Sequence, residues 1–239
     1  MRHRLLLPAL IIAGCSPATQ TGGIEIKPVV GKPTAYITPG PTAKPKPSPT
    51  QDLPATGTPS LPPTEQSALD EVARSSGKAI RAIHRLSFQT SKGEISITTF
   101  PDEAPQAAAK FLQLVKAGVY DGTTFHRVIP NFVAQGGDPQ SKTLPVGDPR
   151  IGYGTSGDDV PDAFANGLKH LVGSVALAHD ARANSSNCQF YICLAAQPSL
   201  DDRYIVFGHV LAGLAVAQAL NPTETGGAPD KITKATMVE

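Results

Sequence analysis

The sequence predicts a mixed, mostly β domain with two helices in the C-terminal two-thirds of the chain, after an N-terminal third that does not fold. Residues 86–100 form two stretches of alternating apolar and polar side chains around Ser91-Lys92-Gly93, which is typical of a β-hairpin. Residues 124–135 read as two further short strands around a turn at Pro130-Asn131. By contrast, residues 16–63 hold roughly half of the 23 prolines and few large apolar side chains, so they cannot bury enough surface to fold.

The N-terminus resembles the signal peptide of a bacterial lipoprotein. A short basic start precedes the apolar run 5–12, which is shorter than the roughly 20 residues needed to cross a bilayer, and small residues precede Cys15 as in a lipobox. We therefore expect residues 1–14 to be removed and Cys15 to carry a lipid such as palmitate. The protein would then be exported and anchored to the outer face of a bacterial cell membrane through this lipid only. The alternatives are an ordinary secretory signal cut elsewhere and an apolar start that is not processed.

Between the signal and the domain, residues 15–66 are expected to form a disordered proline-rich tether that lifts the domain away from the lipid headgroups. An alternative interpretation treats residues 23–37, which contain several isoleucines and valines, as an interaction strand. Residues 67–84 are expected to link the tether to the domain. In this linker Ser67 would cap a short helix that runs to about Arg74.

The composition indicates one ordinary core and no nucleic-acid partner. The 21 Lys+Arg and 20 Asp+Glu nearly cancel, and residues 85–239 are numerous enough to fold alone as a monomer. Cys188 and Cys193 flank an extended run that would hold them about 17 Å apart, which is too far for a disulfide. No CxxC pattern and no metal-ligand spacing occurs, so no metal is expected.

Two helices are predicted within the domain. Pro105 fits the first turn of a helix that runs to about Ala117 and is ended by Gly118, and a second helix is expected over residues 211–220. The apolar stripe of the first helix comprises Ala108, Phe111, Leu112, Leu114 and Val115.

The strands around Pro130-Asn131 place a cation inside an apolar run. Because alternate side chains of a strand share a face, Phe125, Arg127 and Ile129 are expected to point one way, and so are Val133 and Gln135. If the strands fold back on each other, Arg127 and Gln135 line one shallow surface. The alternative for Arg127 is a solvated edge residue whose stem packs on apolar neighbours.

Two nearby features are interpreted as structural. His126, on the face opposite Arg127, is expected to be a hydrogen-bonded core histidine. Residues 152–157 match the spacing GxGxxG, but the carboxylates of Asp158 and Asp159 would repel a pyrophosphate and Pro161 prevents a continuous helix, so a simple loop is expected.

Residues 125–138 resemble the signature of the cyclophilins, the peptidyl-prolyl cis-trans isomerases. The family pattern Phe-His-Arg-(Ile/Val)-Ile-Pro-x-Phe-x-x-Gln-Gly-Gly-Asp is met at every fixed position. Residues 173–179, 188–193 and 200–210 are similar to later family segments, so the resemblance covers roughly residues 85–239. It implies a closed antiparallel β-barrel of about eight strands capped by two helices.

The resemblance also implies a pocket for an X-Pro bond. Arg127 would donate a hydrogen bond to the proline nitrogen as the bond twists, and Gln135, with Gln189, would orient Arg127 and hold the substrate backbone. The remaining binding residues implied are Phe132, Val133, Tyr191 and Leu200 around the proline ring, Ala178 and His179 beside the preceding residue, and Tyr204 at the rim. No nucleophile, metal or bound cofactor is required.

The chain departs from the family pattern at three positions of this pocket. His179 replaces an asparagine, Ser199 lies where many members carry a tryptophan, and Tyr204 replaces a histidine. The spacing between Ala178 and Gln189 is also about one residue longer than in the commonest members, so the loop 180–187 is expected to sit differently. Because the missing indole is linked in the family to cyclosporin binding, we expect weak inhibition by that drug.

The function favoured by these features is a peptidyl-prolyl cis-trans isomerase that assists the folding of exported proteins and acts on X-Pro segments of unfolded polypeptides. One alternative is a cyclophilin-like binding or chaperone module for proline-containing segments, with weak or no catalysis. A second alternative is a structural or adhesive surface protein whose main feature is the tether.

Overall fold

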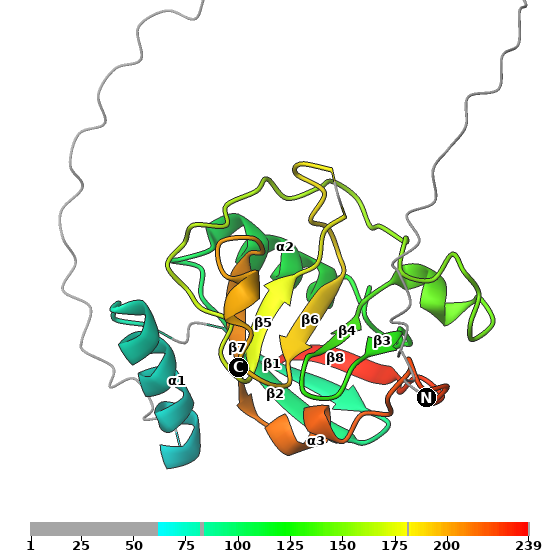
Figure 1. The fold of residues 1–239 in the computed structure, drawn as a ribbon, viewed down its shortest axis with the longest axis horizontal. Helices are drawn as coiled ribbons and strands as arrows, with labels where there is room; N and C mark the ends of the chain where they lie inside the picture. The colour runs from blue at the N-terminus through cyan, green and yellow to red at the C-terminus, as the bar shows by residue number, and fades with distance from the viewer. Residues whose placement is uncertain (1–61, 82–83, 181, 239) are drawn as a thin grey trace, which may run out of the picture. The chain divides into compact units, whose positions relative to one another are not determined.

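Eight strands form one antiparallel sheet in the order β3-β4-β6-β5-β7-β2-β1-β8 (Figure 1). The computed structural model describes residues 62–81, 84–180 and 182–238. The predicted signal peptide, the lipidation site Cys15, most of the predicted tether and the alternative strand 23–37 lie outside these residues. No helix in the described part of the chain is long and apolar enough to span a bilayer.

The elements follow one another in a simple order. The helices are α1 (Pro63–Ser76), α2 (Pro105–Lys116) and α3 (Leu214–Gln218), with two 3-10 turns, η1 (Pro139–Lys142) and η2 (Pro198–Leu200). The strands are β1 (His84–Thr90), β2 (Gly93–Thr99), β3 (Arg127–Val128), β4 (Val133–Gly136), β5 (Ser174–Leu177), β6 (Phe190–Cys193), β7 (Val206–Ala212) and β8 (Ile232–Val238).

The predicted closure of the barrel is wrong, because the sheet is curled but open. Its edge strands β3 and β8 do not pair as strands in the described residues. β3 has only two residues, and the chain before it is joined to the start of β8 by one isolated bridge, between Thr124 and Lys231. Backbone hydrogen bonds such as Phe125 N–H to the Asp230 carbonyl (2.9 Å) supplement that bridge without extending it into a ladder.

The hairpin and the first helix are confirmed. β1 and β2 pair in register from His84 opposite Thr99 to Thr90 opposite Gly93. α2 begins at Pro105, and Gly118 follows it with a φ of 67°, which suits a residue without a Cβ. Of the predicted stripe, Leu112 is only partly buried, and Ala107 is buried with the rest.

Two helix predictions need correction. β7 continues through residues 211 and 212, and Gly213 then turns in the left-handed region (φ 82°), so the last helix is only the short α3. α1 begins at Pro63 rather than at Ser67. Proline suits the first position of a helix, because the backbone N–H groups of the first turn have no partner within the helix. Ser67 therefore lies within the first turns of α1 and is not its cap.

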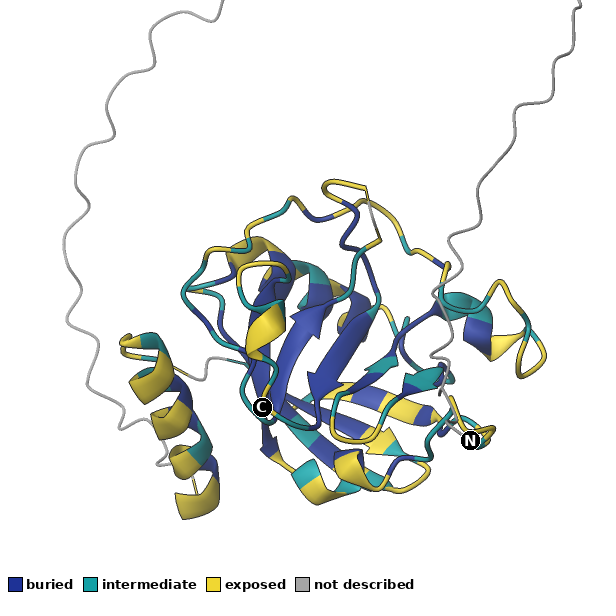
Figure 2. Cartoon of the chain, in the orientation of Figure 1, coloured by how far each residue is buried: buried dark blue, intermediate teal, exposed yellow. Residues whose placement is uncertain are grey.

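Apolar side chains form two layers on opposite sides of the sheet. The inner layer is an aromatic cluster in which Phe111 of α2 lies 5.8 Å from Phe88 and 4.7 Å from Phe207, measured between ring centroids. The outer layer includes Leu69 and Val72 of α1, both buried against the side of β7. In Figure 2 α1 is dark blue on the side that faces the sheet and yellow on its outer side. Because the same outer layer continues into Val133 and Tyr191, the helix packs on the layer that contains the predicted pocket.

The two cysteines of the domain are both buried and both free, as predicted. Burial raises the pKa of the Cys188 thiol to about 11 and that of Cys193 to about 12. Both therefore remain neutral thiols with little reactivity at neutral pH.

Candidate functional site

The antiparallel pair β3–β4 brings Arg127 and Gln135 directly opposite each other. The predicted alternation holds for Val133 and Gln135, which line the same cavity, but not for Phe125. Phe125 lies before β3 and is fully buried in the inner core with Val128, on the other side from Arg127. The prediction that Phe125 and Arg127 share a face is therefore wrong, because the chain is not a regular strand before Arg127.

A cavity of about 100 Å³ lies where β3, β4, β6 and η2 meet. Nine of the ten residues predicted for the pocket line it: Arg127, Phe132, Val133, Gln135, Ala178, His179, Tyr191, Leu200 and Tyr204. The tenth, Gln189, does not line this cavity but is hydrogen-bonded to Gln135. Residues that are far apart in the sequence are thus gathered around one apolar cup with a guanidinium at its edge.

Arg127 is held loosely at the mouth of this cavity, with 43% of its side chain exposed. Its Cζ lies 5.8 Å from the centroid of the Phe132 ring, within range of a cation–π contact. Its Nε lies 3.4 Å from a carboxylate oxygen of Glu224. Such an exposed ion pair contributes no more than about 1 kcal/mol, so the guanidinium can exchange this partner for a ligand.

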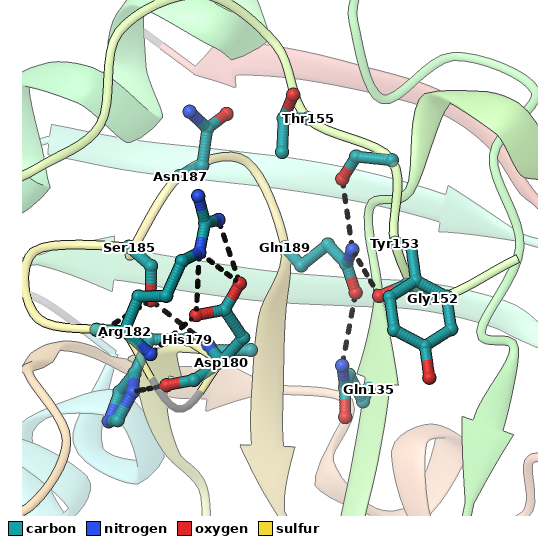
Figure 3. A pocket seen from close by; sticks show the side chains of 12 residues that line it. Gln135, Gly152, Tyr153, Thr155, His179, Asp180, Arg182, Ser185, Asn187 and Gln189 are labelled. Carbon is teal, nitrogen blue, oxygen red and sulfur yellow. Dashed lines mark hydrogen bonds and ion pairs between the residues drawn. The ribbon is translucent and has the colours of Figure 1, made fainter. Parts of the chain in front are cut away.

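A hydrogen-bonded chain supports Gln135 from behind (Figure 3). The Gln135 side-chain amide donates to Gln189 Oε1 at 3.1 Å, and Gln189 Nε2 donates to the carbonyls of Gly152 and Gly154, each at 2.9 Å. The fully buried carboxylate of Asp138 accepts from the backbone N–H groups of the same two glycines at 2.5 and 3.2 Å. The segment 152–157 is therefore the predicted loop, and its backbone holds Gln189 in place.

A second cavity of about 120 Å³ adjoins the first and shares Gln135, Ala178 and His179 with it (Figure 3). The exposed pair Asp180 and Arg182 lies on its rim, with 2.7 Å between Arg182 Nη2 and the Asp180 carboxylate. Hydrogen bonds from the Arg182 side chain lower the pKa of Asp180. Two polar loops thus border the side of the site beside Ala178.

The aromatic wall of the first cavity contains two of the three departures from the family pattern. His179 lies 4.4 Å from Tyr204, and Tyr204 makes a T-shaped contact with Tyr191 at 5.7 Å, both measured between ring centroids. The third departure, Ser199, is exposed on η2. Tyr204 therefore supplies apolar wall in the position of the family's histidine, whereas nothing large replaces the tryptophan.

Comparisons with known proteins agree with this geometry. The sequence model of the cyclophilin-type peptidyl-prolyl cis-trans isomerase family matches residues 85–238. The chain belongs to this family. It is 38% identical over 153 residues to a peptidyl-prolyl cis-trans isomerase of Schizosaccharomyces pombe, covering 62% of this chain and 95% of that protein. It is 36% identical over 152 residues to a probable peptidyl-prolyl cis-trans isomerase of Brucella abortus, covering 61% of this chain and 78% of that one.

Solved cyclophilins share the fold. A cyclophilin-type isomerase of Cryptosporidium parvum, crystallised in the presence of the dipeptide Ala-Pro, superposes with a TM-score of 0.57 at 24% identity and covers 65% of this chain and 99% of its own. A cyclophilin of Hirschia baltica superposes with a TM-score of 0.56 at 23% identity and covers 72% of this chain and 80% of its own.

In this cyclophilin His126 is not the hydrogen-bonded core histidine that was predicted. Neither ring nitrogen has a hydrogen-bond partner among the described residues. Burial lowers the pKa of the ring, which therefore stays neutral at physiological pH. The correction follows from the break in strand geometry before Arg127, which turns the imidazole toward Gly152 rather than into the core.

Several residues of the cyclophilin site were not found from the sequence. Glu224 reaches Arg127 from an irregular loop far along the chain, and no motif marks it. Asp138 is a fixed member of the signature, but its partners Gly152 and Gly154 stand in a loop whose only sequence signal is the spacing of a phosphate-binding motif. Among the described residues, no group of His, Cys, Asp or Glu could hold a metal ion.

Proposed function

We propose that this protein is an exported peptidyl-prolyl cis-trans isomerase that acts on X-Pro segments of unfolded polypeptides and is held to the outer face of a bacterial membrane by a lipid on Cys15. The observation that carries the catalytic part is the convergence of nine pocket residues on one apolar cup with Arg127 at its edge. The observation that supports the anchor is the basic start and apolar run before Cys15.

The chemistry required is a lowering of the rotation barrier. An amide bond resists rotation by about 18–20 kcal/mol because the nitrogen lone pair is shared with the carbonyl. As the bond twists, the proline nitrogen becomes pyramidal and regains that lone pair, so a donor aimed at the nitrogen binds the twisted state better than the planar one. In this proposal Arg127 is the catalytic donor, and a charge-assisted hydrogen bond of about 1.5–3 kcal/mol accounts for roughly ten- to a hundredfold in rate.

The other pocket residues bind and orient. Phe132, Val133, Tyr191 and Leu200 enclose the proline ring. Gln135 holds the substrate backbone and orients Arg127, and Gln189 supports Gln135 through their hydrogen bond. Ala178 and His179 lie beside the residue that precedes proline, and Tyr204 closes the rim. The apolar cup excludes water that would stabilise the planar carbonyl, and it strengthens the interaction with the guanidinium.

The decisive experiment follows cis-to-trans exchange of a short X-Pro peptide with the full chain and with Arg127→Ala. We expect the variant to lose at least about tenfold in kcat/KM, with a smaller change in peptide affinity. Arg203→Ala is the matched control, because Arg203 is an exposed arginine near the rim that does not line the cavity. Equal rates for the wild type and Arg127→Ala would contradict the role of Arg127.

The same experiment separates the competing functions. Tight peptide binding without turnover would instead support a binding module, which His179 and Ser199 favour because they replace the family's asparagine and tryptophan. Deletion of residues 16–63 should leave solution activity unchanged, since the tether is proposed only to position the domain. For the anchor, mass spectrometry of the mature protein from bacterial membranes should show a lipid on Cys15, and an unmodified Cys15 would contradict it.

A further inference from the structure

The floor of the proline pocket is held from behind by a buried chain of three side chains. Tyr191 on β6 is 4% exposed, and its hydroxyl lies 2.9 Å from Nε2 of His170, which is 2% exposed. The Nδ1 and the backbone nitrogen of His170 lie 2.9 and 2.8 Å from one carboxylate oxygen of Asp201. Asp201 directly follows Leu200 of η2, another residue of the pocket wall.

The direction of the hydrogen bonds follows from the chemistry of the groups. A carboxylate can only accept, so Nδ1 of His170 carries the proton, and the lone pair on Nε2 accepts from the Tyr191 hydroxyl. Burial lowers the pKa of His170 and raises that of Tyr191, so both stay neutral at physiological pH. Burial opposes the charge on Asp201, but hydrogen bonds from the backbone and ring of His170 lower its pKa overall, so it stays ionised.

This arrangement answers a problem that the sequence raises at position 191. Tyr191 lines the cavity and is 4% exposed, so its phenol hydroxyl is buried at the floor of an apolar cup. A buried phenol without a partner is costly, and in an apolar cup it would point into the cup or draw in water. The hydrogen bond to His170 directs the hydroxyl out of the cavity and leaves the ring for the substrate.

We propose that His170 and Asp201 are positioning residues of the isomerase pocket, which hold Tyr191 by its hydroxyl so that its ring forms a fixed apolar floor for proline. The inference rests on the proposed function, because it assigns the cavity to a proline ring. His170 and Asp201 act only through Tyr191 and, in the case of Asp201, through the neighbouring Leu200. Lys169 Nζ lies 3.7 Å from Oδ2 of Asp201 and so does not compete for Oδ1, the oxygen that binds His170.

The test is a double-mutant cycle on the full chain. His170→Phe keeps a ring of similar size but removes the acceptor, and we expect it to weaken X-Pro peptide binding about tenfold, mainly as a rise in KM. Adding Tyr191→Phe removes the stranded hydroxyl and should recover at least about threefold of that loss, with the Tyr191→Phe single variant completing the cycle.

A second cycle supplies the matched control. Tyr204 lines the same cavity and makes a T-shaped contact with His170 at 6.5 Å between centroids, but its hydroxyl makes no hydrogen bond to His170. Adding Tyr204→Phe to His170→Phe should therefore not restore binding. Unchanged binding in His170→Phe, or equal recovery by Tyr204→Phe, would overturn the inference.

A spectroscopic measurement keeps this inference separate from the proposed function. The nitrogen NMR shifts of His170 in the wild-type protein report which ring nitrogen carries the proton, whether or not the protein catalyses exchange. The Nδ1–H tautomer, with Nε2 changing its shift in Tyr191→Phe, supports the positioning role. An Nε2–H tautomer contradicts it, whereas absent isomerase activity with the expected tautomer contradicts only the proposed function.

Discussion

Gly154 lies so close to Asp138 that no side chain would fit between them. A Cβ built on Gly154 overlaps the Asp138 carboxylate and lies 3.0 Å from Cγ of Gln140. The backbone of Gly154 is not in the left-handed region, so alanine can adopt it without strain, and only the overlap matters. The substitution Gly154→Ala therefore tests whether the Asp138 carboxylate is as firmly held as its hydrogen bonds indicate.

The expected loss of stability follows from the hydrogen bonds that Asp138 would lose. Its carboxylate accepts from the backbone N–H groups of Gln140 at 2.7 Å, Gly152 at 2.5 Å and Gly154 at 3.2 Å. Each hydrogen bond to a charged group contributes about 1.5–3 kcal/mol, so loss of two of them lowers the free energy of unfolding by about 3 kcal/mol or more. The melting temperature should then fall by about 10 °C.

The displacement should also reach the proposed catalytic site. If the loop moves, Gln189 loses the two carbonyls that hold its amide, and Gln135 loses its support. We expect about a tenfold loss in kcat/KM for an X-Pro peptide, beyond the loss of stability.

The two predicted effects are checked by measuring the melting temperature and the rate of X-Pro exchange of Gly154→Ala, with Gly147→Ala as the control. A Cβ at Gly147 meets no heavy atom within 4 Å, although its φ of 85° makes alanine cost about 1 kcal/mol there. Gly154→Ala should be clearly worse than this control in both measurements. If Gly154→Ala melts and turns over like the wild type, Asp138 does not hold the loop and the chain of support to Gln135 is refuted.

Three further predictions concern the packing, the pH response and the pocket rim. Leu69→Ala in α1 removes a side chain that is buried in the outer apolar layer, although α1 lies outside the matched family region. The free energy of unfolding, measured in urea, should fall by about 2–5 kcal/mol. Glu71→Ala, at an exposed position of the same helix, should have no effect. Equal stability of both variants would mean that α1 is not docked. Burial lowers the pKa of His209 to about 4, below its ordinary value near 6.5, so the unfolded chain takes up a proton more readily than the folded one. The contribution of neutral His209 to the free energy of unfolding is therefore fully present above pH 6.5 and is lost as the pH falls toward 4, by up to about 3 kcal/mol. Urea titrations at several pH values should show this slope in the wild type and a flatter one in His209→Gln. Because exposed Ser199 leaves no indole at the rim, cyclosporin should inhibit exchange weakly, and submicromolar inhibition would contradict this.

The part of the site that could be predicted lies where local geometry dominates. Arg127 and Gln135 sit on two short strands around one turn, so their relation depends on a few residues of chain, and the structure pairs them directly opposite each other. Phe132 lies in that turn, just before β4, and lines the same cavity. The predicted faces of Phe125 and His126 were wrong because the strand starts only at Arg127. Alternation holds only inside a strand, and no residue before Arg127 signals that boundary.

The closure of the barrel was mispredicted for a long-range reason. Whether the sheet closes depends on whether β3 and β8, its two edge strands, can pair with each other. β3 has only two residues, and the chain before it makes a single isolated bridge to the start of β8. Glu224 and the Tyr191–His170–Asp201 chain are likewise contacts between segments that carry no mutual signal in the sequence.

The linear sequence was enough to reveal the family, because a long signature of fixed residue types specifies both the local strands and the groups proposed to act on an X-Pro bond. It also carries the basis for the proposed lipid anchor, which depends only on a linear motif at Cys15. Only the tertiary structure decided which polar groups face one another behind the pocket. Hydrogen bonds require distances near 3 Å between atoms on different elements, and these distances are set by the packing of the whole sheet rather than by any one segment.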